Sequence, residues 1–263
     1  TNSGSGGNPR LKTTEQAFGD KLHTYTIVDA IRDRNVLPCR IDYVNSVQVG
    51  NVQDAQVSSI DTEKALLDSR RLYRIVKYTL EHFDQKTRRA SSYQHSVITN
   101  VRDVVKSRRT VEEISQKKRV HGFNALFATA SIPAAKTYYN QFLNQQRDLT
   151  PDRRLQVGLI YSYAPNEVAP DGVLDDEDFS TDTLGKDDRD FLEDAIADYN
   201  DMFGTSYDTS ADKFQNYYKD LSLRLKNREI DLVIVVNMFL TGFDATTLNT
   251  LFVDKNLRMH GLL

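Results

Sequence analysis

Two short segments of the sequence place hydroxyl, glycine and carboxylate residues directly after apolar runs. The first comprises Thr241, Gly242, Phe243 and Asp244, which follow "DLVIVVNMFL". The second is the stretch from Thr129 to Ser131, which follows "NALFA". A hydroxyl and the unhindered N–H groups beside a glycine can hydrogen-bond a phosphate, and a carboxylate can accept a hydrogen bond from a ribose hydroxyl. These residue types therefore suit contacts with a nucleotide or with a nucleic-acid backbone.

A purely structural explanation competes with this one. Thr-Gly-x-Asp occurs by chance in many strand-to-loop turns, where the glycine makes the turn and the Asp caps the next segment. The sequence contains no G-x-x-x-x-G-K-[ST], G-x-G-x-x-G, H-E-x-x-H or G-x-S-x-G pattern and no cysteine cluster. The histidines lack ligand spacing: His23, His82, His95, His121 and His260. The sequence therefore offers no candidate catalytic residue and no candidate metal site.

Alternating strands and helices are expected to position the two segments. The β-branched run from Ile230 to Val236 is typical of a strand that is covered on both faces. Further strands are expected over residues 124–129 and 156–162, and helices from Pro133, over 187–203 and over 211–227. This alternation predicts an α/β fold with a parallel sheet and helices on both faces. Because ligands collect at the carboxyl ends of such strands, both segments should lie on one sheet edge.

The amino-terminal part gives weaker patterns. A short helix is expected over residues 26–33, and alternation of Ile41 and Tyr43 with polar neighbours predicts a strand over residues 39–49. Apolar residues at helical intervals predict a long helix up to Lys86, for which Asp61 is the expected N-cap.

Two segments carry strongly biased charge. Residues 86–119 are basic, which fits either a solvated helix face or a surface that contacts phosphates. Residues 167–201 are acidic; their first half is expected to be an exposed loop and their second half a helix.

The overall composition sets further limits. The chain has 263 residues, of which 39% are hydrophobic and 27% charged, and its net charge of −3 gives no global attraction to a polyanion. The single cysteine, Cys39, excludes an intramolecular disulfide and makes the cytosol the expected compartment. No signal peptide or membrane span is recognisable. The Gly- and Ser-rich start and the ending "RMHGLL" lead us to expect a piece excised from a longer protein.

The stretch "DLVIVVNMFLTGFDATTLNTLFVDKNLRMHGLL" closely resembles the second motor lobe of the restriction (R) subunit of type I restriction-modification enzymes, which are superfamily 2 DNA translocases. In that family Thr-Gly-Phe-Asp belongs to helicase motif V. "NALFATASI" resembles motif IV, and "FGDKLHTYTIVDAIRDRNVLPCRIDYV" resembles the passage out of the first lobe. The resemblance covers most of the chain, with residues 1–48 as the exit from the first lobe and residues 49–263 as the second.

The resemblance implies a RecA-like lobe in a subunit that uses ATP and Mg²⁺ to translocate double-stranded DNA, and that cuts the DNA with a separate nuclease domain. Thr129, Ser131, Thr241 and Gly242 would contact DNA, and Gly242 and Asp244 would face the ATP between the lobes. Methyltransferase and specificity subunits would be partners, and no membrane is implied.

Parts of the family pattern are missing from this chain. The Walker A lysine and Walker B acids belong to the first lobe, the arginine-bearing motif VI is expected just after Leu263, and the nuclease carboxylates are absent. We therefore expect the chain alone to bind neither ATP nor Mg²⁺, to have no ATPase or nuclease activity and to bind DNA weakly and salt-sensitively.

Two other interpretations stay open from the sequence. The chain could be the second lobe of another superfamily 2 motor, such as a repair helicase. It could also be a non-enzymatic α/β module in which the basic stretch, with Lys117, Lys118 and Arg119, docks partner subunits.

Overall fold

The computed structural model describes residues 25–35, 38–44, 67–107, 111–161, 185–236, 238–239 and 243–255. The chain divides into two compact units, Thr1–Asn45 and Ser46–Leu263. Among the described residues, no helix has both the length and the apolar composition that a transmembrane span requires.

The first unit contains helix α2 (Ile27–Arg32), which begins with a capping box. The Thr26 hydroxyl accepts a hydrogen bond from the Asp29 N–H at 3.3 Å, and the Asp29 carboxylate accepts one from the Thr26 N–H at 2.9 Å. Hydrogen bonds from the Thr26 side chain and backbone lower the pKa of Asp29. The predicted helix is thus confirmed. The strand predicted from Cys39 is absent over residues 38–44, because alternation without a pairing partner forms no ladder, and residues 45–49 lie outside the described part.

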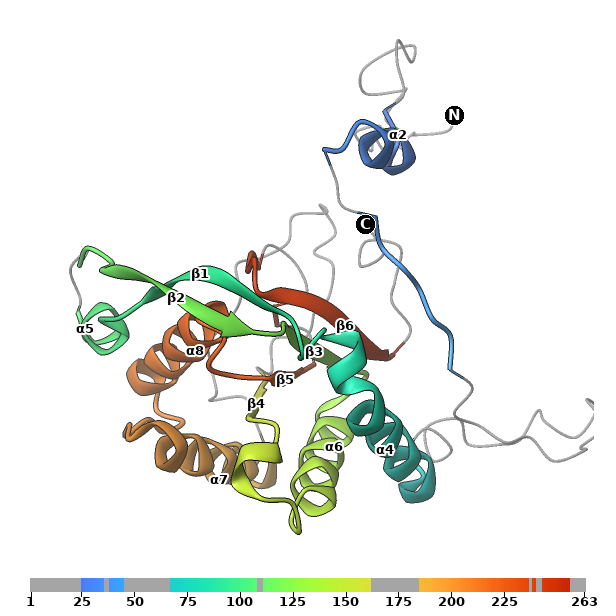
Figure 1. Cartoon of the computed structure of the whole chain (residues 1–263). Helices are drawn as coiled ribbons and strands as arrows, with labels where there is room; N and C mark the ends of the chain where they lie inside the picture. Colours follow the sequence, from blue (N-terminus) through green and yellow to red (C-terminus); the bar gives the residue numbers. More distant parts are fainter. Residues whose placement is uncertain are drawn as a thin grey trace, which may run out of the picture. The chain divides into compact units, whose positions relative to one another are not determined.

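A parallel four-stranded sheet forms the centre of the second unit (Figure 1). Its order is β4-β5-β3-β6, with the bounds β3 (Asn124–Thr129), β4 (Val157–Ile160), β5 (Leu232–Val235) and β6 (Leu248–Asp254). Every residue of β3, β4 and β5 is buried, whereas β6 alternates between less and more exposed positions, as expected of an edge strand. The predicted buried strands are confirmed.

Helices cover both faces of this sheet. On one face, the Phe127 ring packs against Tyr138 and Phe142 of α6 (Ile132–Gln145). On the other, Gly158 lies so close to α8 (Ala211–Lys226) that an added Cβ would come within 2.9 Å of Leu221 Cδ1. Gly158 pairs with Val233, which pairs with Leu126, and these residues point away from Phe127 because side chains alternate along a strand. The predicted α/β, RecA-like fold with helices on both faces is confirmed.

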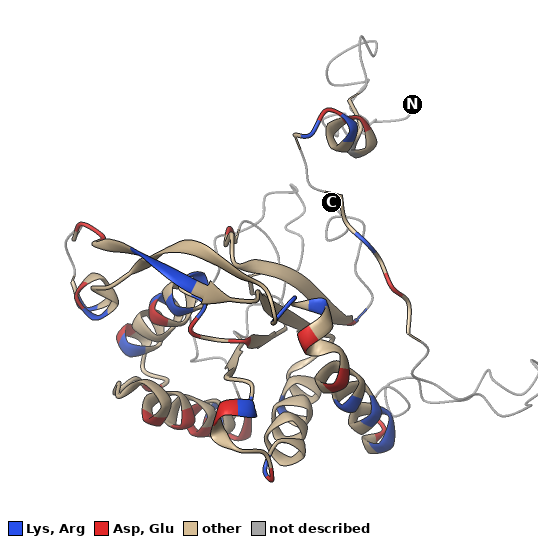
Figure 2. Cartoon of the chain, in the orientation of Figure 1, with Lys and Arg blue, Asp and Glu red and all other residues tan. Residues whose placement is uncertain are grey.

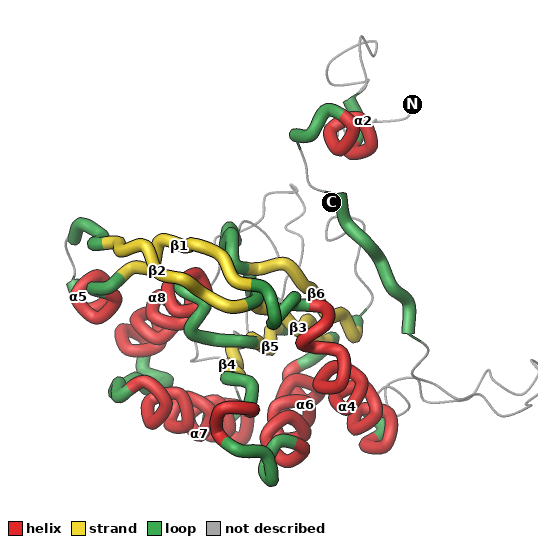
Figure 3. The backbone as a smooth tube through the Cα atoms, in the orientation of Figure 1, coloured by secondary structure: helices red, strands yellow, loops and turns green. Residues whose placement is uncertain are grey.

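The remaining helices complete these layers (Figure 3). Helix α7 (Lys186–Phe203) packs beside β4, where Tyr139 of α6 donates a hydrogen bond to Asp198 at 3.0 Å, and α7 ends at Gly204 with a φ of 62°. Helix α4 (Ser69–Lys86) packs on α6 and has Asp68 as its N-cap. It therefore begins later than predicted from Asp61, and residues 61–66 lie outside the described part. A short 3₁₀ helix, η2 (Pro151–Arg153), precedes β4.

The basic segment forms a two-stranded antiparallel ribbon instead of the solvated helix face considered from sequence. Strands β1 (Ser92–Ile98) and β2 (Ser115–His121) flank the short helix α5 (Val101–Lys106). The Asn227 side chain, just after α8, accepts a hydrogen bond from the Ile98 N–H at 2.7 Å and donates one to the Ile98 carbonyl at 2.8 Å. These two bonds attach the ribbon to the carboxyl end of α8. The first half of the acidic segment, residues 167–184, lies outside the described residues.

Candidate nucleic-acid interface

Thr129 lies at the carboxyl end of β3, with its side chain inside the sheet. Its hydroxyl lies 3.3 Å from the Val235 carbonyl of β5 and 3.3 Å from the Ser131 carbonyl, and the residue is 0% exposed. The Thr129 hydroxyl therefore joins two neighbouring strand ends, so any contact of this position with a ligand has to use the backbone beside it. Such a contact remains a prediction.

Ser131 occupies the N-cap of α6 and is partly exposed. Its Oγ accepts a hydrogen bond from the Ala134 N–H at 3.3 Å, which satisfies one of the free N–H groups of the first turn. Within the described part of the chain, the Ser131 hydroxyl donates no hydrogen bond. The positive end of the α6 dipole also lies here, and a contact of Ser131 with a phosphate remains a prediction.

The described residues that follow β5 start at the same sheet edge but lead away from it. At the edge, the Val236 carbonyl accepts a hydrogen bond from Lys255 Nζ at 2.9 Å. The Phe239 ring then stacks on Tyr218 of α8, with the ring centroids 5.0 Å apart. Phe243 packs on Phe239 with a centroid separation of 4.5 Å. Phe239 and Phe243 thus lie along α8 after the end of β5.

This segment reaches the carboxyl end of α8 before β6 begins. The Lys226 ammonium lies 5.5 Å from the Phe243 ring centroid, and the Thr247 hydroxyl donates to the Leu225 carbonyl at 3.1 Å. Asp244, directly after Phe243, is exposed and lies on this stretch. Thr241 and Gly242 lie outside the described residues. The structure therefore does not bring Asp244 together with Ser131 at one sheet edge.

The parallel arrangement of β5 and β6 explains this difference. Two parallel neighbours in one sheet need a crossover that returns the chain to the edge where strands begin. The described residues 236, 238–239 and 243–247 belong to that crossover between β5 and β6. The expectation that Asp244 lies at the carboxyl edge assumed that the loop stays where the strand ends, and this expectation is wrong.

A buried polar cluster, unpredicted from sequence, occupies the carboxyl end of β6. Arg71 of α4 binds both carboxylate oxygens of Asp254, with Nη1 at 2.9 Å from Oδ2, and the Tyr138 hydroxyl donates to Oδ2 at 2.5 Å. The hydrogen bond to Asp254 raises the pKa of Arg71, and burial raises the pKa of Tyr138. The cluster joins α4, α6 and β6 in one fixed arrangement.

Lys255 follows Asp254 and was also missed from sequence. Burial lowers the pKa of its ammonium group, and its Nζ is held by the Val236 carbonyl. The rule that points to strand ends would have found Asp254 and Lys255, because they directly follow the apolar run "TLFV".

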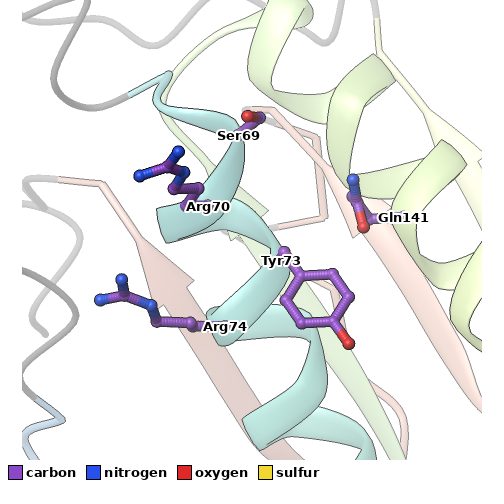
Figure 4. Close-up of a pocket in the computed structure, with 5 residues that line it drawn as sticks. All are labelled: Ser69, Arg70, Tyr73, Arg74 and Gln141. Carbon is purple, nitrogen blue, oxygen red and sulfur yellow. The ribbon is translucent and has the colours of Figure 1, made fainter.

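A shallow hollow of about 480 Å³ lies between α4 and α6 (Figure 4). Its walls are formed by Ser69, Arg70, Tyr73, Arg74 and Gln141. Figure 4 shows Arg70 and Arg74 extending to one side of α4 and Tyr73 to the other. The hollow is shallow and open, and it contains none of the residues predicted for the site.

The described residues could contact the ribose of a nucleotide but not hold its phosphates. Asp244 offers an exposed carboxylate that can accept a hydrogen bond from a ribose hydroxyl. Within the described ranges, no group of three or more His, Cys, Asp or Glu side chains is placed to hold a metal ion. Because the sequence also lacks a G-x-x-x-x-G-K-[ST] loop, these residues do not form a cradle for a triphosphate.

Comparison with known proteins gives two family matches. Residues 121–263 match the family described as type I restriction enzyme subunit R domain 3, and residues 4–72 match the family described as SWI2/SNF2 ATPase. The first match includes β3, the helices that follow it and the other three strands of the parallel sheet.

The individual relatives are described as endonuclease subunits of type I restriction enzymes. The chain is similar to the type I restriction enzyme SauMRSORF196P endonuclease subunit of Staphylococcus aureus (strain MRSA252), with 32% identity over 257 residues, which is 96% of this chain and 23% of the relative. It is 34% identical over 257 residues to the type I restriction enzyme SsaAORF53P endonuclease subunit of Staphylococcus saprophyticus, with the same coverage of 96% and 23%. A segment of 26 residues is 77% identical to the putative type I restriction enzyme MpnIIP endonuclease subunit N-terminal part of Mycoplasma pneumoniae, covering 10% of this chain and 7% of that protein. The chain thus spans about a quarter of the length of its long relatives.

Proposed function

Because this chain belongs to the R subunit family of type I restriction enzymes, we propose that it forms part of a motor that uses ATP to translocate double-stranded DNA. The family match over the parallel sheet is the observation that carries this proposal. The SWI2/SNF2 ATPase match over residues 4–72 supports the use of ATP and Mg²⁺ by the whole protein. The partners of that protein would be double-stranded DNA and the methyltransferase and specificity subunits of the complex.

The chain would contribute most of the second motor lobe. We assign residues 1–48 to the exit from the first lobe and residues 49–263 to the second. Two observations support this assignment: the compact units of the structure divide near that boundary, between Asn45 and Ser46, and the subunit R domain match lies wholly in the carboxyl-terminal part, over residues 121–263.

In this proposal the carboxyl edge of β3 contacts the DNA backbone. Ser131 would donate its hydroxyl proton to a phosphate, supported by the N–H groups at the start of α6. The backbone beside Thr129 would lie against the same strand, because the Thr129 side chain is already bonded inside the sheet. Thr241 and Gly242 would add further phosphate contacts.

The ATP interface would receive Gly242 and Asp244 from the crossover between β5 and β6. The exposed carboxylate of Asp244 supports this role. Since the described residues provide no triphosphate cradle, the phosphates and Mg²⁺ would be held by other parts of the full-length protein. The chain by itself would therefore hydrolyse no ATP.

The experiment that tests the proposal measures DNA-stimulated ATPase activity of the full-length R subunit with its partner subunits. Asp244→Ala should lower the stimulated rate strongly, while Asp201→Ala, at an exposed position of α7, serves as the matched control. Circular dichroism establishes that both variants fold. Equal rates for wild type and Asp244→Ala would show that the Thr-Gly-Phe-Asp stretch is only a turn, and a wild type without DNA-stimulated activity would refute the motor function itself.

A further inference from the structure

The antiparallel ribbon has an unusual charge composition. Strands β1 (SYQHSVI) and β2 (SQKKRVH) contain no Asp or Glu, and Lys117, Lys118 and Arg119 follow one another in β2. All three are exposed. Figure 2 shows blue on β2 and no red along either strand of the ribbon. The nearest acidic residues in the sequence, Glu112 and Glu113, precede β2 on its α5 side. All charged residues of the ribbon are therefore positive, although the chain as a whole has a net charge of −3.

The two faces of the ribbon have different surroundings. One face is turned to the body of the unit: His95 Nε2 lies 2.8 Å from the Lys226 carbonyl of α8, and Val97 is buried. Cross-strand partners point to the same side, so Lys118, the partner of His95, belongs to this face. The alternate residues form the other, outer face: Ser92, Gln94, Ser96, Ile98, Ser115, Lys117, Arg119 and His121. Apart from Ile98 at its α5 end, this outer face carries hydrogen-bonding and cationic groups.

Lys117 and Arg119 have no carboxylate partner among the residues that the structure describes. Three arginines of this unit whose side chains are largely buried are paired: Arg71 binds Asp254, Arg224 binds Asp220, and Arg228 binds Asp231. A lysine on an exposed edge strand can simply prevent unwanted strand pairing. That explanation needs one charge, however, and does not account for a row of consecutive cations without any counter-charge on either strand.

We propose that the outer face of this ribbon contacts the phosphate backbone of the double-stranded DNA, independently of base sequence. The inference rests on the proposed motor function and adds a second DNA-contacting surface to it. Residues two apart on an antiparallel strand are about 6.8 Å apart, which corresponds to about two base-pair steps of 3.4 Å along the duplex. Lys117 and Arg119 can therefore neutralise different phosphates, while Gln94 and the serines donate hydrogen bonds to phosphate oxygens.

The attachment of the ribbon makes it a rigid contact surface. Asn227 binds both backbone groups of Ile98, and His95 binds the last residue of α8. The same residue, Lys226, lies against Phe243, the neighbour of Asp244. The proposed DNA surface and Phe243 thus both contact the same end of α8.

The test is equilibrium binding of the full-length R subunit, without ATP, to fluorescent duplexes of two unrelated sequences over a range of NaCl concentrations. The variant is Lys117→Ser with Arg119→Ser. The control is Lys77→Ser with Lys219→Ser, which makes the same change in net charge at exposed positions of α4 and α8. The loss of two phosphate contacts should lower the slope of log K against log salt by about 1.8 and weaken binding by roughly tenfold or more at 0.1 M salt, equally for both duplexes. The control should bind like the wild type.

A charge-conserving exchange, Lys117→Arg with Arg119→Lys, should restore the wild-type slope. The inference is overturned if the serine variant keeps the slope and affinity of the control. It is also overturned if that variant loses assembly with the methyltransferase and specificity subunits but keeps its affinity for DNA, because the ribbon would then be a docking surface. Binding is measured without ATP, so a wild type that lacks DNA-stimulated ATPase activity would refute the motor function and would be distinguishable from a failure of the ribbon.

Discussion

Arg71, in the first turn of α4, donates hydrogen bonds to both carboxylate oxygens of Asp254, the last residue of β6. The two residues are 183 positions apart in the sequence. The side chains are 9% and 17% exposed, so the pair is largely removed from water. Breaking a buried pair costs more than the pair contributes, because one charge is left without a partner. We therefore predict that Asp254→Ala lowers the free energy of unfolding by about 3 kcal/mol.

Replacing both partners should be much less harmful. The double variant Arg71→Met with Asp254→Leu leaves no unpaired charge and should recover much of that loss. Glu81→Ala, which removes the exposed partner of Lys77, is the control and should change the free energy of unfolding by less than about 0.5 kcal/mol. Urea unfolding measures all of these. A double variant as unstable as Asp254→Ala would contradict the explanation from unpaired charge.

Two substitutions of Ser131 separate its role as the N-cap of α6 from its proposed contact with a phosphate. Asp and Asn are both good N-caps, so Ser131→Asp and Ser131→Asn should keep the free energy of unfolding within about 0.5 kcal/mol of wild type. Only Ser131→Asp puts a negative charge where we place a phosphate, so it should weaken DNA binding by the full-length subunit while Ser131→Asn largely keeps it. Fluorescence anisotropy at low salt measures the difference. Equal DNA affinities of the two variants would show that Ser131 does not contact the DNA backbone.

Gly122, between β2 and β3, is required for a backbone reason. Its φ is +59°, and an added Cβ would lie 2.6 Å from the Arg89 Cα. Because the clash involves backbone and the conformation is left-handed, Gly122→Ala should destabilise the unit by about 3 kcal/mol. Gly185→Ala, whose Cβ would meet no atom closer than 4.0 Å, should cost at most about 1 kcal/mol. Thermal unfolding compares the two, and similar losses would show that Gly122 is not strained by a side chain.

The buried tyrosines predict a loss of stability at alkaline pH. Burial raises the pKa values of Tyr138, Tyr139, Tyr161 and Tyr199 above the ordinary value of 10.0. Above that pH the unfolded chain ionises these phenols while the folded chain keeps them protonated. Their stabilising contribution is therefore complete below about pH 10. Above pH 10, each of these tyrosines should lower the free energy of unfolding by about 1.4 kcal/mol for every pH unit.

Substitution of a single tyrosine tests its contribution to this pH dependence. Tyr139→Phe keeps the packing of the ring but loses the hydrogen bond to Asp198, so it should cost about 1 kcal/mol at neutral pH. Above pH 10 its stability should fall with a slope smaller by about 1.4 kcal/mol per pH unit. Tyr73→Phe, on the exposed side of α4, is the control. Urea unfolding at several alkaline pH values tests this, and a slope shared by Tyr139→Phe and wild type would contradict it.

The parts of the fold that follow from local patterns could be predicted from sequence. The continuous apolar runs identify β3 and β5, and the stripes of α6, α7 and α8 identify helices, because burial on one or two faces leaves a period in the sequence. The ribbon could not be identified in this way. Among the described residues, β1 and β2 pair only with each other, across the α5 insertion, and the polar sequence of β2 gives no hydrophobic alternation.

The candidate site was predictable in residue type but not in position. Ser131 lies at a strand end because a short loop joins β3 directly to α6. Asp244 does not, because its position depends on the contacts that Phe239 and Phe243 make with α8, a helix whose position the sequence does not reveal. The Arg71–Asp254 pair is a long-range contact of the same kind.

Lys226 has a thermodynamic consequence for experiments that combine variants. Its carbonyl is within hydrogen-bonding distance of His95 on the ribbon, and its ammonium lies over Phe243 next to Asp244. Because the two neighbourhoods share this residue, changes made in each of them are not energetically independent. A double-mutant cycle between His95 and Phe243 should therefore yield a nonzero interaction energy, although the two side chains belong to segments that are more than a hundred residues apart in the chain.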